Sequence, residues 1–213
     1  MKHYSCFLII GLFIFAQSAW GQCASIRQSP RTDVVIETGH PIVDNSKPRS
    51  AFPSKTTSTT MGLTVANIAH QLQIETETRE GANKRICIVL SKVKLTVSIP
   101  NLDVYIDKKY KPGSCQYSVI SQHEQKHVRI HQNGLKASKD KLQRALDAAV
   151  KKQKPILLSS HEHPQQKTNK ILQSLTQDIE GVVKEIQDEI NKRNLALDTT
   201  ESYIHESRKC PKW

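Results

Sequence analysis

The chain has 213 residues, a formal net charge of +11 and an aromatic fraction of 5%. This length suits one domain with a real core, which must be mainly aliphatic because aromatic residues are scarce. The composition excludes a bundle of transmembrane helices, because the only long apolar run lies at the N-terminus.

That N-terminal run has the features of a secretory signal peptide. It covers residues 6–16, follows Lys2, and is about half as long as a membrane span. Small residues at Ala19 and Gly21 occupy the positions that a signal peptidase reads, so we expect cleavage after Gly21. The mature protein would then be secreted or periplasmic, with no stable membrane insertion. Loss of one positive charge would lower +11 to +10; the alternative is an uncleaved N-terminal anchor.

Four cysteines remain after this cleavage, and an oxidising compartment favours two disulfides among them. Of the three possible pairings, we expect Cys87–Cys115, which would tie a strand to the start of a helix. The second bond would then be Cys23–Cys210, which would tie the chain ends together. A zinc cluster of cysteines is not indicated, because no two lie at C-x-x-C spacing.

The next region is expected to form a small antiparallel sheet. Residues 22–60 have the composition of an irregular segment, with one possible short strand at 33–37. Residues 63–107 alternate apolar and polar side chains, which predicts a half-solvated antiparallel sheet. The strands expected there lie at residues 70–78, 85–99 and 102–107.

Two long helices are expected after the sheet. Ser114 suits an N-cap, and the first helix is predicted from about 115 to 152. Pro155 follows its end, and a second helix with an apolar stripe is predicted from about 165 to 195. Their short connection predicts an antiparallel hairpin. Gly134 lies on the apolar face of the first helix. Glycine within a helix costs about 1 kcal/mol of stability relative to alanine, so its presence there indicates a close approach by another element.

The expected fold class is therefore α+β. A small antiparallel sheet is followed by a long two-helix antiparallel hairpin, and disulfides staple the structure. One domain would span residues 61–213, after the signal peptide and the irregular segment, and would end in a tail at 196–213.

The first helix carries the pattern H-E-x-x-H at His123, Glu124 and His127. Residues four apart on a helix share a face, so the two imidazoles can bind one ion. A catalytic zinc keeps three protein ligands and one water, and Glu124 is placed to take a proton from that metal-bound water. Attack of the water on a polarised carbonyl would hydrolyse a peptide or amide bond. The alternative is a pair of surface histidines, or of core histidines with satisfied hydrogen bonds.

The third ligand stays open on the residues alone. His131 lies eight residues after His123, about 12 Å along a straight helix, so these histidines would not converge on one ion. It is therefore expected to be a polar helix residue. In a hairpin centred near residue 159, the positions beside His127 lie near 191, where Glu189 flanks the apolar stripe of the second helix.

The tail offers Glu201, with Tyr203 nearby. Glu201 follows Asp198 by three residues, a spacing that also suits a capping box at the start of a short helix. His161 and His163 lie in the loop at the far end of the hairpin, where we expect them to be exposed.

Several segments resemble a group of small exported bacterial proteins of uncharacterised function, which are described as secreted zinc-dependent proteases. The similar segments are DVYID at 103–107, YKPGSCQY at 110–117, HEQKHV at 123–128, NLALDTTESY at 194–203 and CPKW at 210–213. The resemblance covers about residues 85–213 and implies a class of enzyme but no substrate. It favours Glu201 as the third metal ligand and Tyr203 as a donor to a developing oxyanion.

The sequence therefore predicts a secreted or periplasmic zinc metallopeptidase that acts on a peptide or a cell-envelope substrate. The alternative is a non-catalytic basic protein, built on a helical hairpin, that binds an anionic envelope polymer through its +10 charge. Nucleic acid is not an expected partner, because the chain is exported and its basic residues are spread out.

Overall fold

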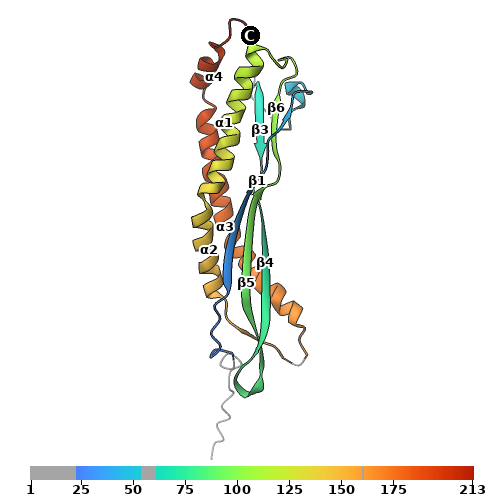
Figure 1. Cartoon of the computed structure of the whole chain (residues 1–213), viewed down its shortest axis with the longest axis vertical. Helices are drawn as coiled ribbons and strands as arrows, with labels where there is room; N and C mark the ends of the chain where they lie inside the picture. Colours follow the sequence, from blue (N-terminus) through green and yellow to red (C-terminus); the bar gives the residue numbers. More distant parts are fainter. Residues whose placement is uncertain (1–22, 54–60, 160) are drawn as a thin grey trace, which may run out of the picture.

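The computed structural model describes residues 23–53, 61–159 and 161–213 (Figure 1). The expected signal peptide at 1–21 lies outside these residues. Within the described ranges, none of the helices combines the length and apolar character that a membrane span requires.

In the described residues, seven strands form two sheets along one side of an elongated molecule (Figure 1). The first sheet has the order β1-β5-β4, with β7 paired to β5. Its strands are β1 (Arg31–Thr38), β4 (Ala69–Glu80), β5 (Ile86–Ile99) and β7 (Ile156–Leu157). The second sheet has the order β2-β6-β3. Its strands are β2 (Ile42–Asp44), β3 (Gly62–Ala66) and β6 (Leu102–Ile106).

Both sheets are mixed, because each receives one parallel strand from the N-terminal segment. β1 pairs in parallel with β5, and β2 pairs in parallel with β6, whereas the β4–β5 and β3–β6 pairs are antiparallel. The N-terminal segment was expected to be mostly irregular, with one possible short strand at 33–37, which falls within β1. Its strands carry few buried apolar side chains, with only Val34 of β1 fully buried, so their pairing depends on distant partners that local pattern does not report.

Two long helical segments cover the sheets. The first, expected as one helix, is interrupted at Ser138, which ends α1 (Cys115–Ala137) and begins α2 (Lys139–Lys152). The second is α3 (Pro164–Leu197), and a short helix, α4 (Thr200–Ser207), follows it. Single-turn 3-10 helices occur at Arg49–Ala51 and Ala82–Lys84.

The two helical segments form an antiparallel hairpin with a shared apolar core. A Cβ atom at Gly134 would lie 2.6 Å from Cγ1 of Ile190, so α1 and α3 approach each other closely there, as the glycine predicted. Apolar side chains of α2 and α3 continue the core, including Leu142, Leu146 and Ile179, each 0% exposed. The α+β class and the hairpin predicted from the sequence are confirmed.

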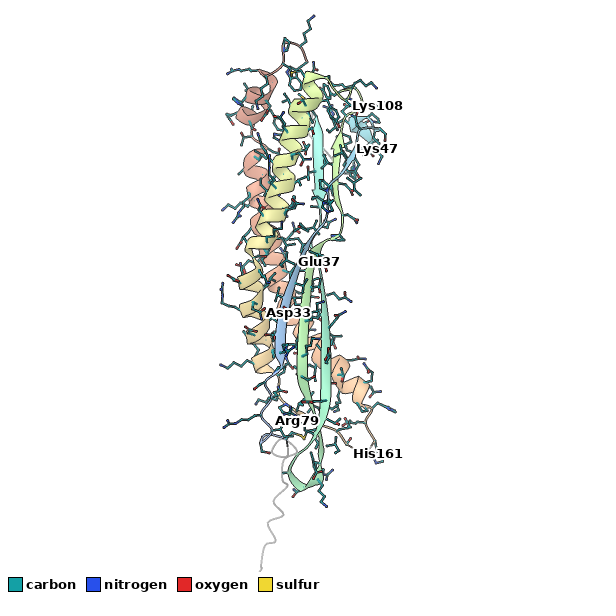
Figure 2. All side chains as sticks on the ribbon, in the orientation of Figure 1. Asp33, Glu37, Lys47, Arg79, Lys108 and His161 are labelled. Atoms are coloured by element: carbon teal, nitrogen blue, oxygen red, sulfur yellow. A yellow bond between two sulfur atoms is a disulfide. The ribbon has the colours of Figure 1, made fainter. Side chains whose placement is uncertain are left out.

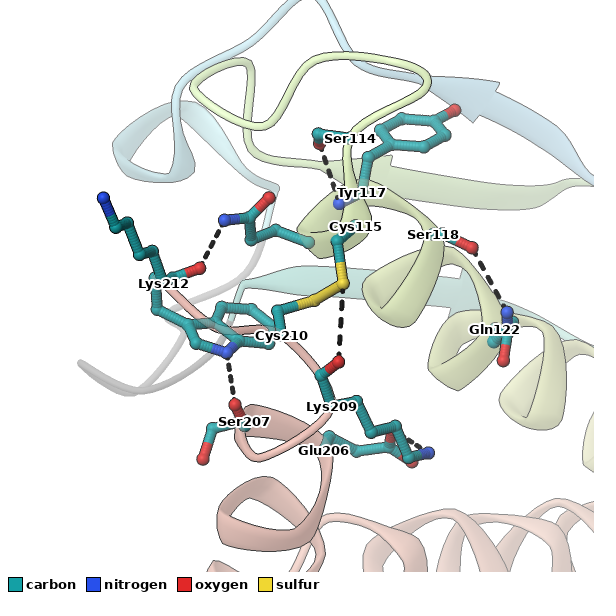
Figure 3. Close-up of a disulfide and its surroundings, with 12 residues drawn as sticks. Ser114, Cys115, Tyr117, Ser118, Gln122, Glu206, Ser207, Lys209, Cys210 and Lys212 are labelled. Atoms are coloured by element: carbon teal, nitrogen blue, oxygen red, sulfur yellow. Dashed lines mark hydrogen bonds and ion pairs between the residues drawn. A yellow bond between two sulfur atoms is a disulfide. The ribbon is translucent and has the colours of Figure 1, made fainter.

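The disulfides join Cys23 to Cys87 and Cys115 to Cys210 (Figure 3), so the pairing expected from the sequence is wrong. Cys87 lies near the hairpin end of β5, and Cys115 begins α1 at the opposite end of the molecule (Figure 1). Since bonded cysteines need Cα atoms about 4.4–6.8 Å apart, those two cannot meet. The two disulfides are typical of an oxidising compartment outside the cytoplasm.

Candidate metal centre

The inward face of α1 carries the H-E-x-x-H pattern. His123, Glu124 and His127 are each at most 5% exposed. Ser114 starts this helix by accepting a hydrogen bond from the backbone N–H of Tyr117 at 3.2 Å. The helix therefore holds both imidazoles and the carboxyl group in a region shielded from solvent.

Asp198 completes a cluster with the two histidines. Its Oδ1 lies 3.0 Å from Nε2 of His123 and 3.0 Å from Nε2 of His127, and the two Nε2 atoms are 3.2 Å apart. Donor atoms about 2.0–2.1 Å from a tetrahedral zinc are roughly 3.3 Å from one another. The three atoms therefore have nearly the spacing of three corners of a tetrahedral site, and no other metal-binding group of this kind occurs in the described ranges.

The other ligand candidates lie elsewhere. Glu201, expected as the third ligand, is exposed in the first turn of α4 and is not part of the cluster. Glu189 is exposed and accepts a hydrogen bond from Nζ of Lys141 at 2.9 Å. Asp198 caps the C-terminus of α3 and replaces Glu201 as the candidate third ligand.

His131, His161 and His163 lie outside the cluster, as predicted. His131 lies one turn beyond the cluster and bonds to Asn194 instead of joining it. His161 and His163 are exposed, and Figure 2 places His161 at the end of the molecule opposite Lys47 and Lys108.

The ionised form of the Asp198 carboxyl is strongly favoured. Burial raises the pKa of its carboxyl, but hydrogen bonds with His123, His127 and Tyr203 outweigh burial and hold the pKa well below 3.8. The Tyr203 hydroxyl donates to the same Oδ1 at 2.9 Å. An anionic oxygen therefore faces both imidazoles across the pH range in which proteins fold.

The pKa of His127 reflects the same cluster. Burial lowers it, but hydrogen bonds with Asp198 and Asn194 and the charge of Glu124 leave it above 6.5. A proton on His127 therefore stabilises the cluster when no other positive charge balances the carboxylate of Asp198. A cation can take the place of that proton, because the imidazole must be neutral to bind a metal.

Glu124 does not belong to the ligand cluster. Its Oε2 accepts a hydrogen bond from Oγ1 of Thr64 on β3 at 2.8 Å. Burial raises the pKa of Glu124 above 4.5, against the charge of His127 and the Thr64 hydrogen bond, which both lower it. A buried carboxyl group with a raised pKa beside two histidines has the properties of a general base.

Asn194 bonds to the ring nitrogen of His127 that faces away from Asp198, and this residue was not identified from the sequence. Its Oδ1 lies 2.8 Å from Nδ1 of His127, and its Nδ2 lies 3.0 Å from Nε2 of His131. Burial, and then the charge on His127, lower the pKa of His131 to about 4, so this imidazole is neutral. The Nδ1 atoms of His123 and His131 have no hydrogen-bond partner among the described residues.

The C-terminal segment closes one side of the site. The Cys115–Cys210 disulfide fastens it to the start of α1 (Figure 3). Lys126 donates to the buried carboxylate of Glu206 at 2.9 Å. A cavity lies between this segment, α1 and the start of β3. It is lined by Met61, Gly62, Val119, Ile120, His123, Glu124, Tyr203, Glu206, Ser207 and Trp213.

Comparisons with protein-family models, with curated proteins and with solved structures find no match to this chain. The function is therefore inferred from the chemistry of the cluster and of the residues around it.

Proposed function

We propose that the protein is a secreted or periplasmic zinc-dependent peptidase that hydrolyses a peptide or amide bond. The observation that supports this most directly is the spacing of His123, His127 and Asp198 beside the buried Glu124. The resemblance to exported proteins described as zinc-dependent proteases favours the same class. A cell-envelope peptide is a substrate compatible with this location.

The donor set fits zinc. Two imidazole nitrogens and one carboxylate oxygen are common zinc ligands, and three protein ligands leave a fourth position open, as in catalytic sites. A structural zinc site would be closed by four protein ligands. When bound, zinc supplies Lewis acidity that polarises a carbonyl group and makes water a nucleophile near neutral pH.

In the proposed reaction, side chains of this protein transfer the protons and hold the reacting groups in position. Glu124 takes a proton from the attacking water, whose oxygen bonds to the carbonyl carbon. The same carboxyl group returns the proton to the leaving nitrogen as the C–N bond breaks. Thr64 fixes the Glu124 side chain through the bond to Oε2.

Tyr203 supplies a hydroxyl group at the edge of the cluster. Its ring centroid is 5.4 Å from that of His123, and its O–H donates to Asp198 at 2.9 Å. In the proposed reaction this O–H turns to the substrate oxygen on which negative charge develops.

The test uses the purified mature protein, its zinc content and its hydrolysis of a peptide library. Glu124→Gln should keep zinc and lose hydrolysis by at least about 100-fold, whereas Asp198→Ala should lose zinc. Glu201→Gln is the matched control and should behave as wild type, because Glu201 is exposed outside the cluster. The proposal fails if wild-type protein never binds zinc, or if Glu124→Gln hydrolyses peptides at the wild-type rate. Zinc binding without hydrolysis would favour the non-catalytic envelope-binding protein.

A further inference from the structure

Folding brings two short basic segments together at one end of the molecule. The first, K-K-Y-K at residues 108–111, lies in the loop between β6 and α1, and the second, residues 208–213, follows α4. The Cys115–Cys210 disulfide ties the second segment to the end of this loop (Figure 3), and Figure 1 shows the loop and the C-terminus at the same end of the structure. The surface that they form is named the basic tip. Its cations are Lys108, Lys109, Lys111, Arg208, Lys209 and Lys212.

The positive charge of the basic tip is largely uncompensated. All six basic residues are exposed, and the two segments contain no acidic residue. The nearest acidic residues along the chain are Asp107 and Glu206. Among the described residues, Lys209 is the only one of the six with a carboxylate partner, Glu206, which Lys126 also binds. This concentration of one sign of charge attracts an anionic surface.

An exposed aromatic ring lies among these cations. Trp213 is 41% exposed, and its ring centroid lies 6.0 Å from that of the buried Tyr110 in an edge-on arrangement. The indole N–H donates to the carbonyl of Ser207, so this donor needs no bond from water. Pro112 and Pro211 add exposed apolar rings to the two segments. Tryptophan favours the boundary between water and lipid, because its ring is apolar and its N–H is polar.

We propose that the basic tip binds the surface of an anionic phospholipid membrane, with Trp213 inserted among the lipid headgroups. Lysine and arginine bind the anionic headgroups, and the indole ring leaves water for the apolar boundary beneath them. A soluble anionic polymer would use the cations but would offer no apolar layer to the ring. Trp213 also lines the cavity beside His123 and Glu124, so docking holds the candidate metal centre close to the membrane. This inference goes beyond the proposed peptidase function and does not depend on it.

The first test measures binding of the mature protein to lipid vesicles by sedimentation and by tryptophan fluorescence. Trp213 is the only tryptophan after Gly21, so the emission reports on the basic tip alone. Vesicles of phosphatidylcholine and phosphatidylglycerol should bind the protein and shift its emission to shorter wavelength, whereas phosphatidylcholine alone should do neither. Salt at about 1 M should release the protein, because the Debye length falls to about 3 Å. Binding without an emission shift would overturn the insertion of Trp213.

The second test removes positive charge from the tip. Each lysine near an anionic surface strengthens binding about five-fold, so removing three should weaken vesicle binding about 100-fold. The variant combines Lys108→Gln, Lys109→Gln and Lys111→Gln. The matched control combines Lys151→Gln, Lys152→Gln and Lys154→Gln.

This control has the same K-K-x-K spacing and the same change of charge. Its three lysines are exposed at the end of α2, far from the start of α1 (Figure 1). The control should weaken binding less than about five-fold. Equal losses in the two triple variants would show that the overall charge of the protein binds the vesicles, and would overturn the assignment to the basic tip.

The third test removes the aromatic ring. Trp213→Ala should weaken vesicle binding about 10-fold, because the apolar ring no longer leaves water. Ile86→Ala is the matched control, since Ile86 is also 41% exposed but starts β5 at the opposite end of the molecule (Figure 1). Its binding should equal that of wild type. Equal binding by wild type and Trp213→Ala would overturn the docking on lipid through the ring.

Two further outcomes also decide the proposal. Binding to soluble polyphosphate without binding to vesicles would assign the basic tip to an anionic polymer and overturn the membrane as its partner. Failure to bind any of the vesicles would overturn the inference and leave the peptidase proposal standing. Vesicle binding needs no hydrolysis, so a protein that binds membranes but cleaves nothing would support this inference and contradict only the proposed function.

Discussion

The side-chain amide of Asn194 determines how His127 presents its two ring nitrogens. Its Nδ2 donates to the carbonyl of Ile190 at 3.2 Å, which fixes the amide so that Oδ1 faces Nδ1 of His127. The Nδ1 atom then donates its proton to Asn194, so Nε2, which donates to Asp198 here, can give its lone pair to a metal when a metal replaces that proton. His131 accepts the second Nδ2 proton at 3.0 Å. One residue of α3 therefore holds a histidine of α1 in the form that binds a metal.

Asn194→Ala should weaken zinc binding by about 10–100-fold, the usual cost of removing a partner behind a metal ligand. The measurement is the dissociation constant of zinc in competition with a chelator. Asn191→Ala is the matched control, because Asn191 is exposed one turn earlier and its Oδ1 accepts a hydrogen bond from Gln187. Equal zinc affinity in wild type and Asn194→Ala would show that the amide does not orient His127.

At the scale of the elements, α1 and α3 depend on a glycine for their close contact at Gly134 and Ile190. In Gly134→Ala, the new Cβ would meet Cγ1 of Ile190 at 2.6 Å and Cδ1 at 3.0 Å. Overpacking costs about 1–3 kcal/mol and exceeds the gain in helix propensity of about 1 kcal/mol. The free energy of unfolding should therefore fall by about 1–2 kcal/mol in a urea titration.

A second glycine provides the control. A Cβ at Gly181 of α3 would meet nothing within 4 Å, so Gly181→Ala should stabilise the protein by about 0.5–1 kcal/mol. If both alanines stabilise the protein, Ile190 moves without cost and the close contact does not matter. Adding Ile190→Ala to Gly134→Ala should cost less than the two single changes together, because it removes the clash.

The short helix α4 is anchored by one buried carboxylate. Glu206 is 7% exposed and binds Lys126 of α1 and Lys209 after α4. Burial raises its pKa, but the hydrogen bonds to the two lysines outweigh burial and hold the pKa below 4.5. Because the folded-state pKa is the lower one, this stabilisation is complete above pH 4.5 and is lost as the pH falls through the folded-state value.

Glu206→Gln should lower the free energy of unfolding by about 1 kcal/mol at pH 7. The difference from wild type should shrink as the pH falls below 4.5, and urea titrations between pH 3 and pH 7 measure it. Glu189→Gln removes the exposed pair with Lys141 and should lower the free energy of unfolding less than Glu206→Gln does. A difference that grows toward low pH would have the wrong sign for a carboxylate held ionised by lysines.

The periodicity of the sequence predicts both helical segments, but it does not predict how they are aligned. A hairpin centred near residue 159 places residue 191 beside His127, whereas the contact of Gly134 with Ile190 centres it near 162, midway between those two residues. The connection, residues 153–163, is as long as expected, and its Ile156–Leu157 pairs with β5 as β7, so the difference lies in how the helices are staggered. This shift moves the partner of His127 by six or seven residues, about 10 Å at 1.5 Å per residue. Asp198 therefore reaches the histidines, and Glu201 lies beyond them.

At the scale of the whole molecule, the two disulfides hold different parts, because the start of β5 and the start of α1 lie at opposite ends (Figure 1). Cys23–Cys87 fastens the N-terminal segment to the sheet end that is remote from the cluster. Cys115–Cys210 fastens the C-terminal segment to α1 and therefore restrains Tyr203 and Asp198. Local sequence pattern does not predict this disulfide pairing, because the pairing depends on which ends of the long helices and strands meet after the chain has folded.

The two bonds form a matched pair for an experiment on the site. They close 64 and 95 residues of sequence, so their chain-entropy contributions differ by only about 0.3 kcal/mol. Replacing either pair by alanine should lower the free energy of unfolding by about 2–4 kcal/mol. Only Cys115→Ala with Cys210→Ala should also weaken zinc binding, because only that bond holds the segment beyond Asp198. Chelator competition at a temperature where both variants remain folded measures the difference. Equal zinc affinities in the two variants would mean that α3 alone positions Asp198, without help from the C-terminal segment.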